Sequence, residues 1–134
     1  MIRYNWSKEI SESFGSIMRP VAEIHIKDKN KIWRAVTMYV DSGADVSIIK
    51  RSFGELFGHK IKKGKKIRLK GIGSEIAAYI HKMDLLIGKH EIPLDVAIAD
   101  TDNIPNLLGR KTLFDLFEIR FKNLKKQTHF SKTA

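Results

Sequence analysis

Short apolar runs separated by turn residues recur along this 134-residue chain, and they are the feature that most limits its fold. The runs at 21–26 and 32–40 are rich in strand-forming residues, the first of them loosely alternating. Apolar and polar residues alternate over 66–70 and 117–121, with the two-residue period of strands that bury one face. The turn residues of 28–31 lie between the first two runs and predict a β-hairpin. We therefore predict a mainly β domain.

Further short strands are expected where apolar runs end at glycine or other turn residues. A second hairpin turns at 71–74, and a third turns at Gly88-Lys89. The continuous apolar run Val96-Ala97-Ile98-Ala99 is typical of a buried strand. The remaining strands are predicted at 75–80, 83–87, 90–94, 106–109 and 127–130.

Two short helices are predicted inside this pattern, at 47–57, where Gly58 follows the last apolar residue, and at 110–116. Residues 1–19 precede Pro20 and are predicted to be an arm that forms a short helix, which leaves 20–134 as the folded domain. The predicted helix is based on the helical spacing of four apolar residues, Ile10, Phe14, Ile17 and Met18. Gly15 weakens this prediction, because glycine is unfavourable inside a helix.

Composition narrows the classes of protein that remain. The chain has no cysteine, so disulfides and thiolate metal sites are excluded. No apolar run approaches the ~20 residues that span a bilayer, and the first residues lack the apolar segment of a secretory signal. We therefore expect a cytoplasmic protein. The 25 Lys and Arg exceed the 15 Asp and Glu by 10, a net charge of +10 that favours an acidic partner, nucleic acid first.

The segment Tyr39-Val40-Asp41-Ser42-Gly43-Ala44-Asp45 follows an apolar strand and precedes a short predicted helix. Asp-Ser-Gly alone indicates only a turn, because turns favour these residues. Here a glycine-tipped hairpin, with Gly71-Ile72-Gly73 at its turn, comes about 30 residues later. Leu107-Leu108-Gly109-Arg110 then leads into a predicted helix. The order and separation of these three elements favour a function over a simple turn.

With these motifs, the chain resembles the retropepsin-like aspartic proteases, a single-lobe family that includes the retroviral proteases. The resemblance runs from about Pro20 to Phe121. It implies an all-β, closed barrel of short strands with a flap hairpin and one or two short helices. It also implies an endopeptidase that acts on polypeptides and needs no metal or other cofactor.

Peptide hydrolysis by carboxylates requires a base that activates water and an acid that protonates the amide. Two carboxylates that share one proton supply both functions. The chain has one Asp-Ser-Gly, since Asp100, Asp102 and Asp115 lack that pattern. The second carboxylate is therefore expected from Asp41 of another copy, in a two-fold homodimer.

The resemblance assigns roles to residues around Asp41. Ser42 is expected to hydrogen-bond across the dimer axis, Gly43 to let substrate approach, and Ala44 to complete the active-site loop. Asp45 is expected to pair with Arg110 at the edge of the substrate channel.

Gly109 is expected to pack under the active-site loop, although a plain glycine at a helix start fits the sequence nearly as well. Five residues form the expected flap tip over the substrate, namely Lys70, Gly71, Ile72, Gly73 and Ser74.

Two other functions compete with proteolysis. Residues 60–70 hold seven cations, which indicate either a nucleic-acid or membrane patch or, as we favour, the solvated face of a strand protected by lysine. Aromatic residues make up only 9% of the chain and do not interleave with these cations, which argues against a nucleic-acid-binding barrel. A dimer of the same fold that binds peptides without cleaving them is the other alternative. The five histidines lack metal-ligand spacing, so no metal site is predicted.

Overall fold

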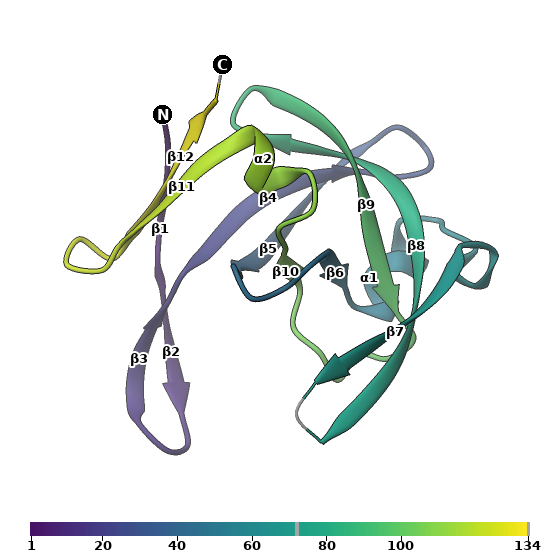
Figure 1. Cartoon of the computed structure of the whole chain (residues 1–134), viewed down its shortest axis with the longest axis horizontal. Helices are drawn as coiled ribbons and strands as arrows, with labels where there is room; N and C mark the ends of the chain where they lie inside the picture. The colour runs from purple at the N-terminus through teal and green to yellow at the C-terminus, as the bar shows by residue number, and fades with distance from the viewer. Residues whose placement is uncertain (72, 134) are drawn as a thin grey trace.

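The computed structural model describes residues 1–71 and 73–133. Within them, a closed barrel is built from β4 (Val21–Lys27), β5 (Trp33–Val40), β6 (Ser47–Ile49), β8 (Ser74–Ile87), β9 (His90–Ala99) and β10 (Leu107–Leu108). These strands are hydrogen-bonded in the order β4-β5-β10-β6-β9-β8, and β8 pairs back onto β4 through His25 and Leu86 (Figure 1). The mainly β domain predicted from the alternating pattern is confirmed.

The strand β7 (Lys65–Gly71) extends the sheet beyond the barrel. It pairs along its length with β8, from Lys65 opposite Ile80 to Gly71 opposite Ser74. It is the last strand in the sheet order among the described residues, so one of its edges has no strand beside it. This is the glycine-tipped hairpin that the sequence predicts.

A smaller sheet joins the two ends of the chain. It contains β1 (Ile2–Asn5), β12 (Gln127–Lys132) and β11 (Phe117–Lys122), in the order β1-β12-β11 (Figure 1). Ile2 pairs with Phe130, and the ring of Tyr4 packs edge-on against Phe130 at 5.3 Å. The first residues of the chain are therefore a strand of the folded domain.

The expected helix in residues 1–19 is wrong. Residues 7–19 form a hairpin of β2 (Ser7–Ser11) and β3 (Gly15–Arg19) that projects from the barrel (Figure 1). Gly15 has φ +69°, a left-handed conformation that ends the turn and breaks any helix. Ile10 and Phe14, which we placed on a helix face, are more than three-quarters exposed at 80% and 82%.

The helices are shorter than predicted. The first, α1 (Arg51–Leu56), leaves residues 47–49 to β6, because that apolar segment is buried and pairs in parallel with β9. The second, α2 (Leu113–Leu116), begins three residues late, after Thr112 at φ +68°. A 3-10 turn, η1 (Ile61–Lys63), precedes β7. In the described part of the chain, no helix reaches the length and apolar character that crossing a bilayer requires.

The central strands are longer than predicted. The runs at 75–80 and 83–87 are one strand, β8, and those at 90–94 and 96–99 are one strand, β9, because the two pair without interruption from Ala78 to Ile87. The last residues of β9 are buried on both faces. Val96 and Ile98 belong to the main core, whereas Ala97 and Ala99 belong to a smaller cluster under β7. This double burial explains the continuous apolar run.

Candidate active site

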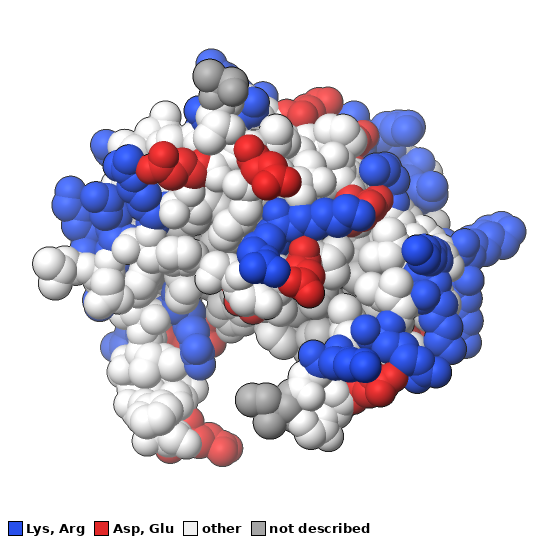
Figure 2. Space-filling model, viewed as in Figure 1, with Lys and Arg blue, Asp and Glu red and all other residues white. Residues whose placement is uncertain are grey.

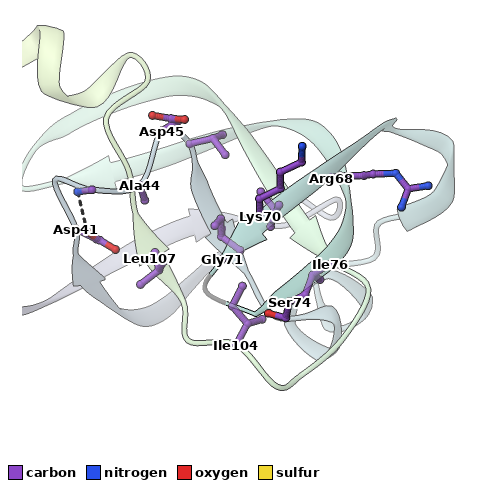
Figure 3. A pocket seen from close by; sticks show the side chains of 14 residues that line it. Asp41, Ala44, Asp45, Arg68, Lys70, Gly71, Ser74, Ile76, Ile104 and Leu107 are labelled. Atoms are coloured by element: carbon purple, nitrogen blue, oxygen red, sulfur yellow. Dashed lines mark hydrogen bonds between the residues drawn. The ribbon is translucent and has the colours of Figure 1, made fainter.

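Asp41 lies in the turn that follows β5. Its main-chain N–H donates to the Leu108 carbonyl at 3.0 Å. Its Oδ1 accepts a hydrogen bond from the N–H of Gly43 at 2.8 Å (Figure 3). The first bond fixes the main chain of Asp41, and the second fixes the orientation of its carboxylate.

The short strand β10 brings the second sequence motif beneath this turn. Leu107 and Leu108 pair in parallel with Tyr39 and Val40 of β5. On its other side, Leu107 pairs antiparallel with Ile48 of β6. β10 therefore lies between β5, which leads into the Asp41 turn, and β6, which follows it.

Gly109 follows β10 at the closest approach of two chain segments. A Cβ atom built on it would lie 2.3 Å from the Val46 carbonyl oxygen and 2.9 Å from that of Ala44. Only a residue without a Cβ fits there. The N–H of Gly109 donates to the hydroxyl of Ser47 at 3.0 Å, and Ser47 is fully buried.

The next two residues complete the connection to the loop. The N–H of Arg110 donates to the Ala44 carbonyl at 2.8 Å, and that of Lys111 donates to the Asp45 carbonyl at 2.9 Å. The Arg110 guanidinium also pairs with the Asp45 carboxylate. Because these two side chains are 55% and 87% exposed, water screens the pair and it adds little stability.

The other loop residues lie at its surface. Ser42 is exposed, and Ala44 is half-buried. A Cβ on Gly43 would come within 3.2 Å of Asp41 Oδ1, a tight contact with the carboxylate.

The tip of the β7–β8 hairpin stands opposite the loop. Lys70 and Gly71 end β7, Gly73 has φ +75° in the turn, and Ser74 begins β8. Ile72, the expected centre of the flap, lies outside the described residues. The register therefore places the four described flap residues, Lys70, Gly71, Gly73 and Ser74, at a hairpin tip.

A pocket of about 500 Å³ lies between the Asp41 loop and this hairpin tip. Polar and charged residues at its rim come from both sides, with Asp41 and Asp45 from the loop and Arg68 and Lys70 from β7 (Figure 3). The apolar lining comes from Val46, Ile48, Leu69, Ile76, Ile104 and Leu107. Such a pocket can hold an extended chain with apolar side chains beside a carboxylate.

Sequence reasoning missed two residues that hold the loop. Ser47 accepts the N–H of Gly109, as described above. Asn106 is buried, its side-chain oxygen accepts the N–H of Lys50 at 2.9 Å, and its carbonyl accepts the N–H of Tyr39 at the same distance. In the sequence, Ser47 and Asn106 are marked only as polar residues that lie beside an apolar run and close to one of the two motifs.

The histidines do not form a metal centre in the described residues, where no group of three metal-ligating side chains occurs. One of them, His59, is buried at the base of the β7–β8 hairpin with its ring 5.1 Å from that of His81. Neither of its ring nitrogens has a hydrogen-bond partner among these residues. Burial, followed by the nearby His81 and Lys29, lowers the pKa of His59 from 6.5 to about 4.

Comparisons with known proteins agree with this geometry. Residues 23–112 match the family model described as aspartyl protease, a span that includes the Asp41 loop, the β7–β8 hairpin and Gly109. The structure is similar to that of the EIAV protease complexed with the inhibitor HBY-793, with a TM-score of 0.57 and 22% sequence identity. The similarity covers 73% of this chain and 88% of that chain, and it shows the retropepsin-like barrel fold. No curated protein matches the sequence.

Proposed function

Because this chain belongs to the aspartyl protease family, it is an aspartic protease, and we propose that its active site forms between two copies that each supply Asp41. One observation carries the proposal. Asp41 lies at the rim of the pocket of about 500 Å³, in the one Asp-Ser-Gly of the sequence. Asp45, the other carboxylate of this pocket, is paired with Arg110 and points into solvent, 87% exposed. A second copy related by a two-fold axis supplies the equivalent Asp41.

Two facing carboxylates give the required acid and base. One of them is ionised and takes a proton from water, whose oxygen attacks the carbonyl carbon of the scissile peptide bond. The protonated carboxyl gives its proton to the carbonyl oxygen, which yields a tetrahedral diol. The diol collapses as a proton passes to the amide nitrogen, the C–N bond breaks, and the dyad again holds one proton.

The contacts around the loop support roles for its neighbours. Gly109 and the bonds from Arg110 and Lys111 hold the loop that presents Asp41. We assign the Asp45–Arg110 pair to one border of the substrate channel and the hydroxyl of Ser42 to a contact with the second copy; the ion pair and the exposure of Ser42 support these roles.

The tip of the β7–β8 hairpin is proposed to be the flap, which covers bound peptide and excludes water. Its position opposite Asp41 across the pocket supports this role. The substrate is a polypeptide that binds in extended form between flap and loop. The location of the protein in the cytoplasm remains a prediction from its composition.

The test is Asp41→Asn, with Asp115→Asn as the matched control on the exposed surface of α2. We expect cleavage of a peptide library to fall about a thousandfold or more in the first variant and to stay at the wild-type level in the second. Both variants should unfold at the wild-type denaturant concentration.

A mixing experiment tests the dyad itself. Excess Asp41→Asn protein should suppress wild-type activity, because subunits exchange and each mixed dimer has only one aspartate. An active monomer in sedimentation, or wild-type activity unchanged by the excess variant, would refute the shared dyad. If the wild type cleaves no member of the library, a dimer that binds peptides without cleaving them becomes the better reading.

A further inference from the structure

We propose that a cationic strip beside the pocket binds an acidic, extended segment of the protein substrate, outside the part that is cleaved. We define the strip by seven side chains on η1, β7 and the residues around them, namely Lys60, Lys62, Lys63, Lys65, Lys66, Arg68 and Lys70. The proposal rests on the proteolytic function, because it specifies the class of substrate.

The strip is an exposed positive surface whose charge is balanced by few nearby carboxylates. All seven side chains belong to exposed residues, and blue side chains gather over β7 in Figure 2. Within the described ranges, only Arg68 has a carboxylate partner, Glu75 at 3.1 Å. The other six cations form no ion pair there. Like charges held this close repel one another, and an acidic ligand relieves that repulsion.

The backbone of the strip is suited to an extended partner. β7 uses one edge to pair with β8, and its other edge has no strand beside it in the described sheet. A polypeptide in extended form can hydrogen-bond to such an edge, as an added strand. Lys66, Arg68 and Lys70 recur at every second residue, so they can meet acidic residues that alternate along the added strand.

The strip runs directly into the candidate active site. Arg68 and Lys70 belong both to the strip and to the lining of the pocket that contains Asp41 (Figure 3). A chain held in the pocket can therefore continue along the strip without a break. The acidic segment bound by the strip and the segment cleaved in the pocket can therefore belong to one polypeptide.

Nucleic acid is the other polyanion that such charge can attract, and the strip suits it less well. Residues 60–71 contain no aromatic side chain on which a base could stack. The free strand edge instead offers main-chain donors and acceptors that match a polypeptide.

The experiment uses peptides that share one cleavable core, taken from the library above, and carry six Glu or six Gln residues at either end. Wild type should cleave one of the Glu-tailed peptides with a kcat/KM about tenfold higher than its Gln-tailed partner at 50 mM salt, through a lower KM. The preference should disappear at 500 mM salt.

The strip variant replaces three cations that do not line the pocket, Lys62→Glu, Lys65→Glu and Lys66→Glu. It should lose the preference and keep its kcat/KM for the Gln-tailed peptide. The control changes the same charge elsewhere on the exposed surface, Lys8→Glu, Lys89→Glu and Lys125→Glu, and should keep the preference. If the strip variant unfolds, the same three positions changed to Gln serve instead.

The outcomes separate this proposal from the proteolytic function. Equal cleavage of Glu-tailed and Gln-tailed peptides by wild type overturns acidic docking and leaves the protease intact. Failure to cleave any peptide overturns the function on which both rest. Salt-sensitive binding of a single-stranded DNA 20-mer that only the strip variant loses, with no preference for Glu tails, would assign the strip to nucleic acid and refute our proposal.

Discussion

The Asp41 loop and the tip of the β7–β8 hairpin face the same pocket, but the loop is held by close contacts whereas the tip has open space around its glycines. Main-chain hydrogen bonds tie the loop to the segment after β10, and Gly109 fits there because it has no Cβ. At the tip, a Cβ on Gly71 would meet nothing nearer than Ser74 Oγ at 3.9 Å, and one on Gly73 nothing within 4 Å, among the described residues.

Glycine therefore serves two different purposes in one site. At the loop it allows close contact, and the contact fixes a carboxylate that must meet its symmetric copy. At the tip, open space surrounds it, and a proposed cover that opens and closes needs that space. The comparison leads us to expect a costly substitution at Gly109 of the loop and a tolerated one at Gly71 of the tip, whereas Gly73 at φ +75° needs glycine for its backbone conformation.

The largest effect is expected for Gly109→Ala. Its Cβ would press on the Val46 carbonyl oxygen, a main-chain atom that cannot move alone. We expect a loss of about 3 kcal/mol in the free energy of unfolding and no detectable cleavage. Urea denaturation and the peptide assay measure both. Gly71→Ala is the matched control and should change stability by less than about 0.5 kcal/mol. Equal stability of the two variants would contradict the comparison.

The base of the β7–β8 hairpin, unlike its exposed tip, contains a buried titratable side chain, that of His59. His59 has a pKa of about 4 in the folded protein and about 6.5 when unfolded, so the unfolded chain binds the proton first as pH falls. The contribution of His59 to stability should be constant above pH 6.5 and should fall by up to about 3 kcal/mol between pH 6.5 and 4. Urea denaturation across this range should show a shallower decline in His59→Phe. Identical pH dependence in both proteins would argue against this role.

Ser47→Ala tests the hidden support of the loop. It removes the buried acceptor for the Gly109 N–H and should cost about 2 kcal/mol. Ser16→Ala, on the exposed face of β3, is the control and should be neutral. Chemical denaturation compares the two. A neutral Ser47→Ala would mean that the loop does not depend on this hydrogen bond.

The smallest effect is expected for Arg110→Gln. Because the partner Asp45 is mostly in water, loss of the ion pair should lower stability by less than about 1 kcal/mol. The difference from wild type should shrink further in 0.5 M salt, since salt screens exposed charges. A loss above about 2 kcal/mol would show that Arg110 supports the loop through more than this ion pair.

The fold was predictable where neighbours in sequence pair in space. Alternation and turn residues identify the hairpin of β4 and β5 and that of β7 and β8, because both are local. They do not identify β6, whose helix-like sequence becomes a strand by pairing with β9, about 50 residues away. Likewise, apolar spacing within 1–19 predicts a helix, whereas the left-handed Gly15 permits a hairpin over 7–19.

The residues of the site likewise differ in whether the local sequence could identify them. Asp41 and Gly109 belong to short motifs and could be identified from the sequence. Ser47 and Asn106 act on partners 62 and 56 residues away, so their importance depends on contacts that no local pattern records. The pocket lining by Ile104 likewise depends on how the barrel closes.

The terminal sheet bears on how the protein is made. β1 begins at Ile2 and its partner β12 begins at Gln127, so β1 is synthesised long before the strand with which it pairs. Pairing across such a separation is slow and comes late. A nascent or prematurely stopped chain therefore contains the Asp41 loop while β1 lacks its partner strand. This sheet can form only after β12 has been synthesised, and it therefore links completion of the fold to translation beyond Lys132.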